Sequence, residues 1–267
     1  MINVRKIVIK IGTSSLTYGS GKLNYRHLKK MVSVICDLKN MGHEVVLVSS
    51  GAVGIGLGKI DGLHKRPDES ASKRALAAIG QSSLMSIYEE IFNIYHCQVA
   101  QVLLTKSVLQ DKANYDDIVA AFSRMFEYDV IPIVNENDVV ASDGIRTEDL
   151  YGDNDTLSAH VAQFIRADLL IIWTDRDGLY DSDPRTNPDA KIIPLVTDVN
   201  EDIYKMASGA GTIRGTGGML TKLNAAGIVM NAGIDMVITN SSRPEDLYGI
   251  LDNKQIGTLF KARTKAL

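Results

Sequence analysis

The sequence predicts an α/β protein built on a parallel sheet that helices cover on both faces. Six short runs are continuously apolar and rich in β-branched residues, which is typical of strands buried on both sides. Segments with helical spacing of apolar residues alternate with these runs, and this order implies right-handed crossovers between parallel strands. With 267 residues, 45% apolar and 23% charged, the chain can bury one sizeable core. We therefore expect a single domain, 1–267, that can have two lobes.

The predicted elements follow one another along the chain. The strands are expected at 6–11, 44–48, 99–104, 130–134, 169–173 and 236–239, and the helices at 25–40, 71–95, 155–165 and 219–232. The apolar face of the first helix comprises Leu28, Met31, Val32, Ile35 and Leu38, and Gly42 marks its end. The apolar face of the second comprises Leu76, Ile79, Leu84, Ile87, Ile91 and Ile94. The segment 174–218 has few apolar patterns typical of strands or helices. We interpret it as a functional excursion from the sheet.

Charge and composition exclude several classes of function. A net charge of -3 and a pI of about 6.0 give nucleic acid or an anionic membrane no general reason to bind. Cys36 and Cys97 lie in apolar stretches without metal-ligand spacing, so we expect buried thiols in a reducing compartment. No apolar run is long enough for a secretory signal or a membrane span. These observations predict a cytoplasmic protein that acts on small molecules, without nucleic-acid or membrane partners.

Residues that follow the predicted strands are candidates for ligand binding, because ligands collect beyond the carboxyl ends of parallel strands. Lys10 lies near the end of the predicted strand 6–11, and Gly12 and Thr13 follow that strand. A lysine there suits an anion, although an edge lysine before an ordinary turn is the alternative. The segment 49–58 holds four glycines and can wrap an anion, or it is a flexible loop. It matches neither GxxxxGK[ST] nor the dinucleotide fingerprint.

Polar clusters occur in three further places. Asn-Glu-Asn-Asp at 135–138 and Gly-Asp-Asn-Asp at 152–155 suit recognition of an ammonium group or organisation of lysines, and helix capping is the alternative for Asp153 and Asp155. The glycine-rich segment 215–218 leads into a helix whose first turns include Lys222. A helix N-terminus with a nearby lysine is an anion site, and a simple glycine-rich helix entry is the alternative.

Together these blocks resemble the amino acid kinase family, and within it the members that phosphorylate the side-chain carboxylate of free glutamate. The matching blocks lie in the family's order at 8–17, 48–56, 71–81, 132–140, 152–159, 174–188, 215–222 and 256–260. The resemblance implies a three-layer α/β/α sandwich with a mostly parallel, roughly eight-stranded sheet. It also implies an N-terminal lobe for glutamate and a C-terminal lobe, from about residue 168, for ATP.

The resemblance assigns roles to individual residues. Lys10 and Lys222 match the two lysines that bind the transferred phosphate, and Asp155 matches the aspartate that holds them. The positions that match glutamate-binding residues are Ser50, Gly51, Asp138 and Asn154. Those that match nucleotide-binding residues are Lys10, Gly12, Thr13, Thr174, Asp175, Thr216, Gly217, Gly218, Met219, Leu220, Thr221 and Lys222.

The resemblance also implies partners and regulation. The substrates would be L-glutamate and ATP with Mg²⁺, and the reaction would be the first step of proline biosynthesis. No residue is assigned as a metal ligand, and whether the protein binds Mg²⁺ directly stays open. Inhibition by proline is expected through the glutamate site and the 57–75 loop. A homo-oligomer, dimer or tetramer, and hand-over of product to glutamate-5-semialdehyde dehydrogenase are further expectations. Many family members continue into a PUA domain, an RNA-binding-like module, and we expect none in this chain.

The residues suit this chemistry, since a carboxylate nucleophile is ionised at pH 7 and needs no general base. The five histidines are accordingly interpreted as structural. Three alternatives stay open at this point: a kinase of the same fold acting on N-acetylglutamate, aspartate or carbamate, a catalytically silent amino-acid sensor, and a dinucleotide-dependent oxidoreductase.

Overall fold

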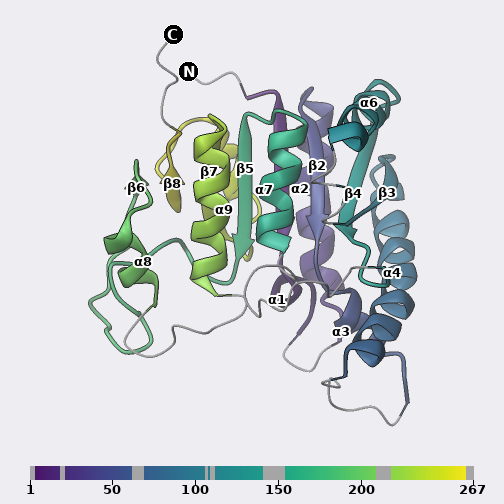
Figure 1. Cartoon of the computed structure of the whole chain (residues 1–267), viewed down its shortest axis with the longest axis horizontal. Helices are drawn as coiled ribbons and strands as arrows, with labels where there is room; N and C mark the ends of the chain where they lie inside the picture. Colours follow the sequence, from purple (N-terminus) through teal and green to yellow (C-terminus); the bar gives the residue numbers. More distant parts are fainter. Residues whose placement is uncertain are drawn as a thin grey trace. The chain divides into compact units, whose positions relative to one another are not determined.

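A computed structural model describes residues 4–18, 22–61, 69–105, 108, 112–140, 154–208 and 218–262 (Figure 1). The chain divides into two compact units. Unit 1 consists of Met1–Lys10 and Thr147–Leu267, and unit 2 is Ile11–Arg146. Each is described by itself below.

The described residues of unit 1 form five strands in the spatial order β1, β5, β7, β8, β6. They are β1 (Lys6–Ile11, whose last residue falls in unit 2), β5 (Leu169–Thr174), β7 (Asp235–Asn240), β8 (Thr258–Phe260) and β6 (Leu195–Val196). β5 pairs in parallel with β7, β6 pairs in parallel with β8, and β7 pairs antiparallel with β8. All six residues of β5 are buried, as its apolar sequence requires.

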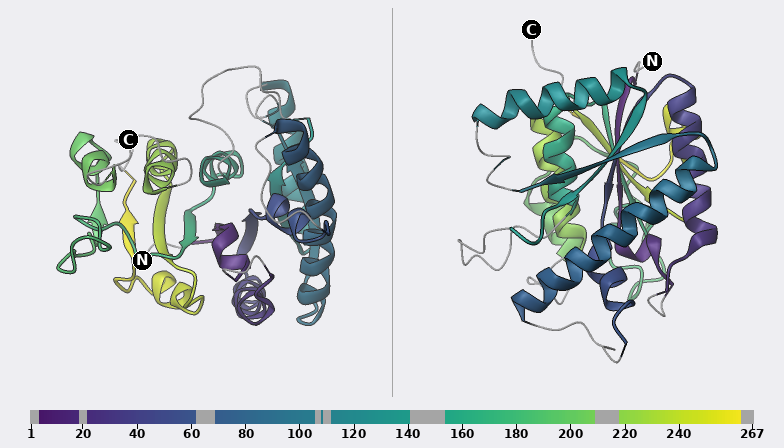
Figure 2. Two further views of the ribbon diagram at one scale, coloured as in Figure 1. Left: turned by 90° about the horizontal axis from the view of Figure 1, so that it is seen from below. Right: turned by 90° about the vertical axis from the view of Figure 1, so that its right-hand side faces the viewer.

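Helices cover both faces of the unit 1 strands. α7 (Asn154–Phe164) and α9 (Met219–Asn231) lie on one face, and α10 (Asp246–Leu251) lies on the other (Figure 2, left). α8 (Glu201–Ser208) packs beside α9. Three layers result, in which the ends of β1, α7 and α9 meet at the site described below.

Unit 2 contains three parallel strands in the order β3 (Gln98–Leu104), β4 (Val130–Glu136), β2 (Glu44–Ser49). Its helices are α1 (Thr13–Leu16), α2 (Tyr25–Asn40), α3 (Ala52–Leu57), α4 (Ser70–Asn93) and α6 (Lys112–Glu127). α2 begins at Asn24, whose side chain accepts a hydrogen bond from the His27 amide, and Gly42 follows its end with φ +96°. α2 packs on β2, α4 on β3 and α6 on β4.

Two glycines let α3 pack unusually close to α4. A Cβ at Gly56 would lie 2.0 Å from the Leu76 carbonyl oxygen, and a Cβ at Gly80 would lie 1.7 Å from the Ala52 carbonyl oxygen. Neither position can hold a larger residue without moving backbone. The loop between β2 and α3 is therefore held at a fixed distance from α4.

The predicted fold class is confirmed, since the described residues form eight strands of a mostly parallel sheet. All six predicted strands and all four predicted helices are present, with ends displaced by a few residues. β6, β8, α1, α3, α6, α8 and α10 were not predicted. The excursion 174–218 contains β6 and α8 and belongs to unit 1.

Two predictions of burial were wrong. β3 was expected to be buried on both faces, but it is an edge strand paired only with β4, and Leu104 alone is buried in it. Ile79 and Ile94 were placed on the buried face of α4, yet they are 38% and 54% exposed. The buried face of α4 instead includes Gly80 and Tyr88, because α3 covers one side of the helix. Within the described ranges, no helix combines the length and apolarity that a bilayer span requires.

Candidate active site

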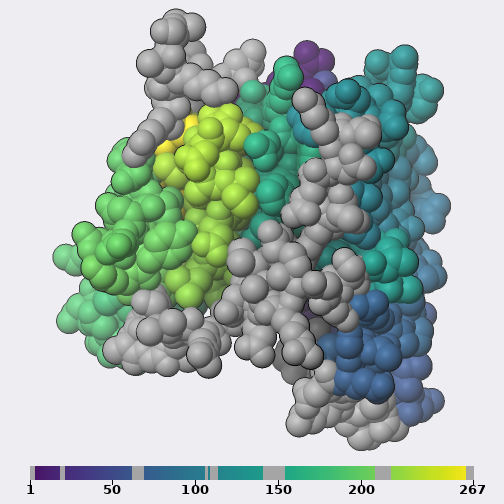
Figure 3. All heavy atoms as spheres, viewed as in Figure 1, coloured from purple at the N-terminus to yellow at the C-terminus, as the bar shows by residue number. Residues whose placement is uncertain are grey.

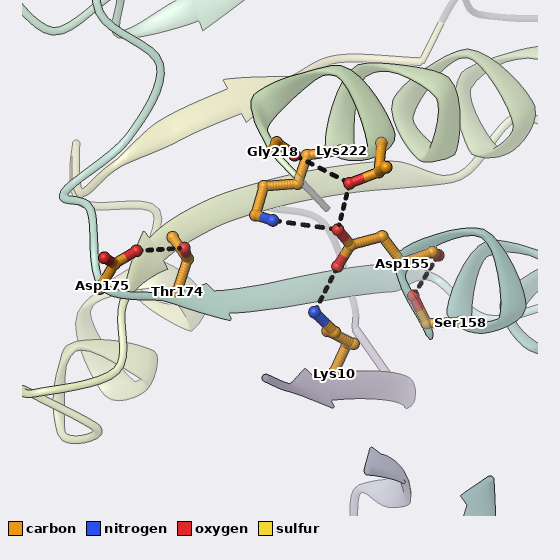
Figure 4. Close-up of polar contacts among 8 residues, drawn as sticks. Lys10, Asp155, Ser158, Thr174, Asp175, Gly218 and Lys222 are labelled. Atoms are coloured by element: carbon orange, nitrogen blue, oxygen red, sulfur yellow. Dashed lines mark hydrogen bonds and ion pairs between the residues drawn. The ribbon is translucent and has the colours of Figure 1, made fainter. Parts of the chain in front are cut away.

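Two lysines from distant segments converge on one aspartate inside unit 1 (Figure 4). Lys10 near the end of β1 places its Nζ 2.7 Å from Asp155 Oδ1, and Lys222 in α9 places its Nζ 3.0 Å from Asp155 Oδ2. Asp155 lies in the first turn of α7 and is 1% exposed; each lysine is 7% exposed. Each carboxylate oxygen thus has its own ammonium partner.

Further hydrogen bonds fix the aspartate to both helices. Thr221 Oγ1 lies 2.8 Å from Asp155 Oδ2 and 2.8 Å from the Gly218 carbonyl oxygen. Ser158 Oγ donates to the Asp155 carbonyl oxygen at 2.6 Å. The start of α7 and the start of α9 are therefore joined through one buried carboxylate, and both lysines are held with little freedom.

The electrostatics of this cluster favour an anion. Burial alone would raise the pKa of Asp155, but the charges and hydrogen bonds of Lys10 and Lys222 outweigh burial and lower that pKa to about 2. The carboxylate is thus ionised at neutral pH. Two ammonium groups and one carboxylate leave one positive charge in a largely buried setting, where its attraction for an anion is weakly screened.

The start of α9 adds backbone donors to this positive charge. Gly218 is the residue before the helix, and its extended backbone has no side chain that caps the first turn. The space that a Cβ would occupy there is open. Since the first amides of a helix have no acceptor within it, those of Met219, Leu220 and Thr221 suit a phosphate group. Lys222 stands next to them.

A pocket of about 300 Å³ in unit 1 extends from this helix start. It includes the predicted nucleotide-binding residues Thr174, Asp175, Gly218, Met219, Leu220 and Lys222. Thr174 Oγ1 donates to Asp175 Oδ1 at 3.1 Å at the end of β5. Figure 3 shows the side chains of α9, in yellow-green, at the surface beside the green ones of α8. Because Lys222 both lines the pocket and contacts Asp155, the pocket reaches the lysine cluster.

Sequence reasoning missed several pocket residues. The remaining lining residues are Arg176, Gly178, Leu179, Tyr180, Ser182, Asp183, Pro184, Arg185, Met206 and Ala207. Most of them belong to the segment 174–188, which matches the family's sequence pattern. That match could therefore have identified these residues as pocket residues. Met206 and Ala207 come from α8, whose contribution depends on tertiary packing against α9.

The other candidate residues are divided between the units. Gly12, Thr13, Ser50, Gly51 and Asp138 lie in unit 2, and Asn154 begins α7 in unit 1. Gly12 precedes α1, and Gly51 precedes α3 with φ +105°, a conformation that favours glycine. The Ser50 amide donates to the Ile11 carbonyl oxygen at 3.0 Å, a hydrogen bond within unit 2. Thr216 and Gly217 lie outside the described residues.

Comparison with known proteins gives concordant matches. The sequence profile of the Amino acid kinase family matches residues 5–240. A glutamate 5-kinase of Clostridium perfringens is 48% identical over 97% of this chain and 96% of its own length. A glutamate 5-kinase of Listeria monocytogenes is 44% identical over 98% of this chain and 94% of its own length. One of Caldanaerobacter subterraneus is 48% identical over 96% of this chain and 67% of its own length.

Solved structures with the same fold are more distant in sequence. A UMP kinase of Bacillus anthracis has a TM-score of 0.67 at 15% identity, covering 98% of this chain and 97% of that one. An isopentenyl phosphate kinase of T. acidophilum has a TM-score of 0.62 at 17% identity, covering 95% and 98%. These likenesses support the fold alone.

Proposed function

The chain belongs to the Amino acid kinase family, and from this premise we propose that it transfers the γ-phosphoryl group of ATP to the side-chain carboxylate of L-glutamate. The product is L-glutamate 5-phosphate, and the reaction is the first step of proline biosynthesis. The names of relatives that are 44–48% identical over nearly the whole chain support this activity. The observation that carries the chemistry is the buried group Lys10, Asp155 and Lys222.

The reaction needs alignment and charge neutralisation more than proton transfer. Glutamate attacks as a carboxylate, which is already ionised at pH 7, and it must approach a phosphoryl group of the same sign. Lys10 and Lys222 offset the charge on the migrating phosphoryl group, and the amides at the start of α9 hold the nucleotide phosphates. Asp155 keeps both ammonium groups directed at one place, so that little reorganisation accompanies the transfer.

The nucleotide and its metal are assigned to unit 1. ATP occupies the pocket that Thr174, Asp175 and the start of α9 line. Mg²⁺ prefers phosphate oxygens, water and one or two carboxylates to an all-protein cage. Mg²⁺ bound to ATP would supply further neutralisation of phosphate charge.

The experiment that tests the activity is a hydroxamate assay, in which hydroxylamine traps an acyl phosphate. The protein is incubated with ATP, Mg²⁺ and glutamate, N-acetylglutamate or aspartate, with and without proline. We expect hydroxamate with glutamate, because its free α-ammonium can pair with a carboxylate. Turnover of N-acetylglutamate in preference to glutamate, or glutamate binding without ATP consumption, would refute the proposal.

Selectivity for the free amino acid is assigned to Asp138, in the turn after β4. The Asp138 carboxylate accepts hydrogen bonds from the α-ammonium of glutamate, and charge-assisted bonds of this kind are strong. We expect Asp138→Asn to raise the glutamate KM by about tenfold or more while the ATP KM changes little. Steady-state kinetics, with glutamate and ATP varied in turn, measure the two KM values. An equal rise in the KM values for glutamate and ATP would contradict the role of Asp138 in glutamate selectivity.

The resemblance also assigns glutamate binding to Ser50, Gly51 and Asn154, and phosphate binding to Gly12, Thr13, Thr216 and Gly217. These assignments stay predictions. Inhibition by proline, an oligomeric assembly, a cytoplasmic location and hand-over to glutamate-5-semialdehyde dehydrogenase stay predictions.

A further inference from the structure

Three polar residues of α4 in unit 2 recur at seven-residue intervals. They are Arg74, Gln81 and Tyr88, and we call them the polar stripe of α4. Seven residues make nearly two full helical turns, so the three side chains lie on one side of the helix. Each makes a hydrogen bond to the chain at or just after the end of β2 or β4. These strands lead into Ser50 and Asp138, two of the proposed glutamate-binding residues.

We propose that the polar stripe positions the two glutamate-binding loops, so that its members are positioning residues for the substrate acid. The inference rests on the proposed function and deepens it. It also gives a role to the 71–81 block, which the function proposed above leaves unused.

Tyr88 acts on the loop after β2. Its hydroxyl lies 2.7 Å from Ser49 Oγ, and both residues are fully buried. Ser49 Oγ in turn donates to the Ser50 carbonyl oxygen at 3.1 Å. Two hydrogen bonds thus connect the Tyr88 hydroxyl, through the Ser49 hydroxyl, to the peptide of Ser50.

Gln81 and Arg74 act on the loop after β4. Gln81 Oε1 accepts from Asn135 Nδ2 at 2.8 Å, and Asn135 is 4% exposed near the end of the strand. Arg74 Nη1 donates to the Val139 carbonyl oxygen at 3.2 Å. Asp138 lies between these two attachment points and directly precedes the second. Its loop is therefore held from both sides by one helix.

The backbone of α4 is itself fixed against the loop after β2. Gly80, next to Gln81, lies against the Ala52 carbonyl oxygen so closely that no Cβ fits. α3 follows Ser50 and Gly51 directly, so this contact sets the distance from the loop to α4. The side-chain hydrogen bonds then specify which way the loop atoms point, which apolar packing alone does not.

The test uses single substitutions in the full-length protein and compares two Michaelis constants. Tyr88→Phe removes one hydroxyl and keeps the ring, and Arg74→Met removes the donor to Val139. We expect each to raise the glutamate KM about tenfold, with the ATP KM and the thermal midpoint little changed. Arg74→Lys, which keeps a donor, should restore most of the glutamate KM.

Tyr95→Phe is the matched control for Tyr88→Phe. The Tyr95 hydroxyl donates to the Lys29 carbonyl oxygen at 3.5 Å, away from both loops, so its removal should leave both constants unchanged. A glutamate KM in Tyr88→Phe and Arg74→Met equal to that of the control would overturn the inference. So would an equal rise in the two KM values, because that pattern indicates general loosening of the fold. Absence of glutamate hydroxamate with the unmodified protein would instead refute the proposed function, and the inference with it.

Discussion

Replacing Lys222 or Lys10 by alanine should lower kcat about a hundredfold or more while the protein stays folded. With both lysines present, the buried group has one surplus positive charge. Either substitution leaves one ammonium paired with Asp155 and a net charge of zero. The attraction that matches the charge developing on the phosphoryl group is then lost, and kcat and kcat/KM fall together.

The measurement is the hydroxamate assay under saturating substrates, together with thermal unfolding. Lys205→Ala serves as the control, because that lysine of α8 has a side chain 72% exposed and forms surface ion pairs with Glu201 and Asp202. Surface pairs of this kind contribute little to stability, so we expect unchanged turnover and midpoint. Full turnover in Lys10→Ala or Lys222→Ala would refute the assigned role of that lysine.

The sequence predicted the strands that are long and continuously apolar, and it failed where elements are short. β5 and β1 are buried throughout or nearly so, and their residues are apolar except for Lys6 and Lys10 of β1 and Thr174 at the end of β5. β6 and β8 contain two and three residues, too few for any periodicity to appear. The helix α6 was missed for a different reason. Its half-buried or buried residues Tyr115, Ile118, Val119, Phe122 and Phe126 have helical spacing, so the signal was present.

The candidate site was predictable where residue type and strand position act together. For each of Lys10, Asp155 and Lys222, the sequence pattern also allowed a purely structural interpretation. These were an edge lysine, a helix cap and a simple glycine-rich helix entry. The structure brings these three side chains into contact, a result that no local pattern fixes.

Other contacts could not be predicted from sequence patterns, because they depend on tertiary packing. The hydrogen bond of Thr221 to Asp155 depends on how α9 meets α7. The polar stripe was hidden for a related reason. Tyr88 and Gly80 occupy buried positions of α4 where apolar side chains were expected, because α3 and the ends of β2 and β4 contact this side of the helix.

Asp155→Asn should be the most damaging single substitution in the site, lowering the free energy of unfolding by about 3–5 kcal/mol and kcat by about a hundredfold or more. The neutral amide leaves two ammonium groups facing each other at 7% exposure without a counter-charge. Urea unfolding at pH 7 measures the first effect, and the hydroxamate assay measures the second. Unaltered stability would contradict a tight electrostatic coupling of the three groups.

A double variant tests the effect of Asp155→Asn on stability apart from its effect on activity. In Asp155→Asn/Lys222→Met one of the repelling charges is gone, so stability should recover part of what the single variant loses. Activity should not recover, because Lys222 is itself needed for transfer. Recovery of turnover along with stability would contradict the roles assigned to both Lys222 and Asp155 in transfer.

The pH dependence of stability gives an independent measure of the same coupling. The pKa of Asp155 is lowered from 3.8 to about 2 in the folded protein, so the unfolded chain binds the proton more readily. The resulting stabilisation, about 2 kcal/mol, is fully present above about pH 4 and is lost as the pH falls through about 2. In Asp155→Asn this component is absent. The difference in unfolding free energy between the two proteins should therefore shrink as the pH falls below about 4, and a constant difference over that range would mean that the lysines do not lower the pKa of Asp155.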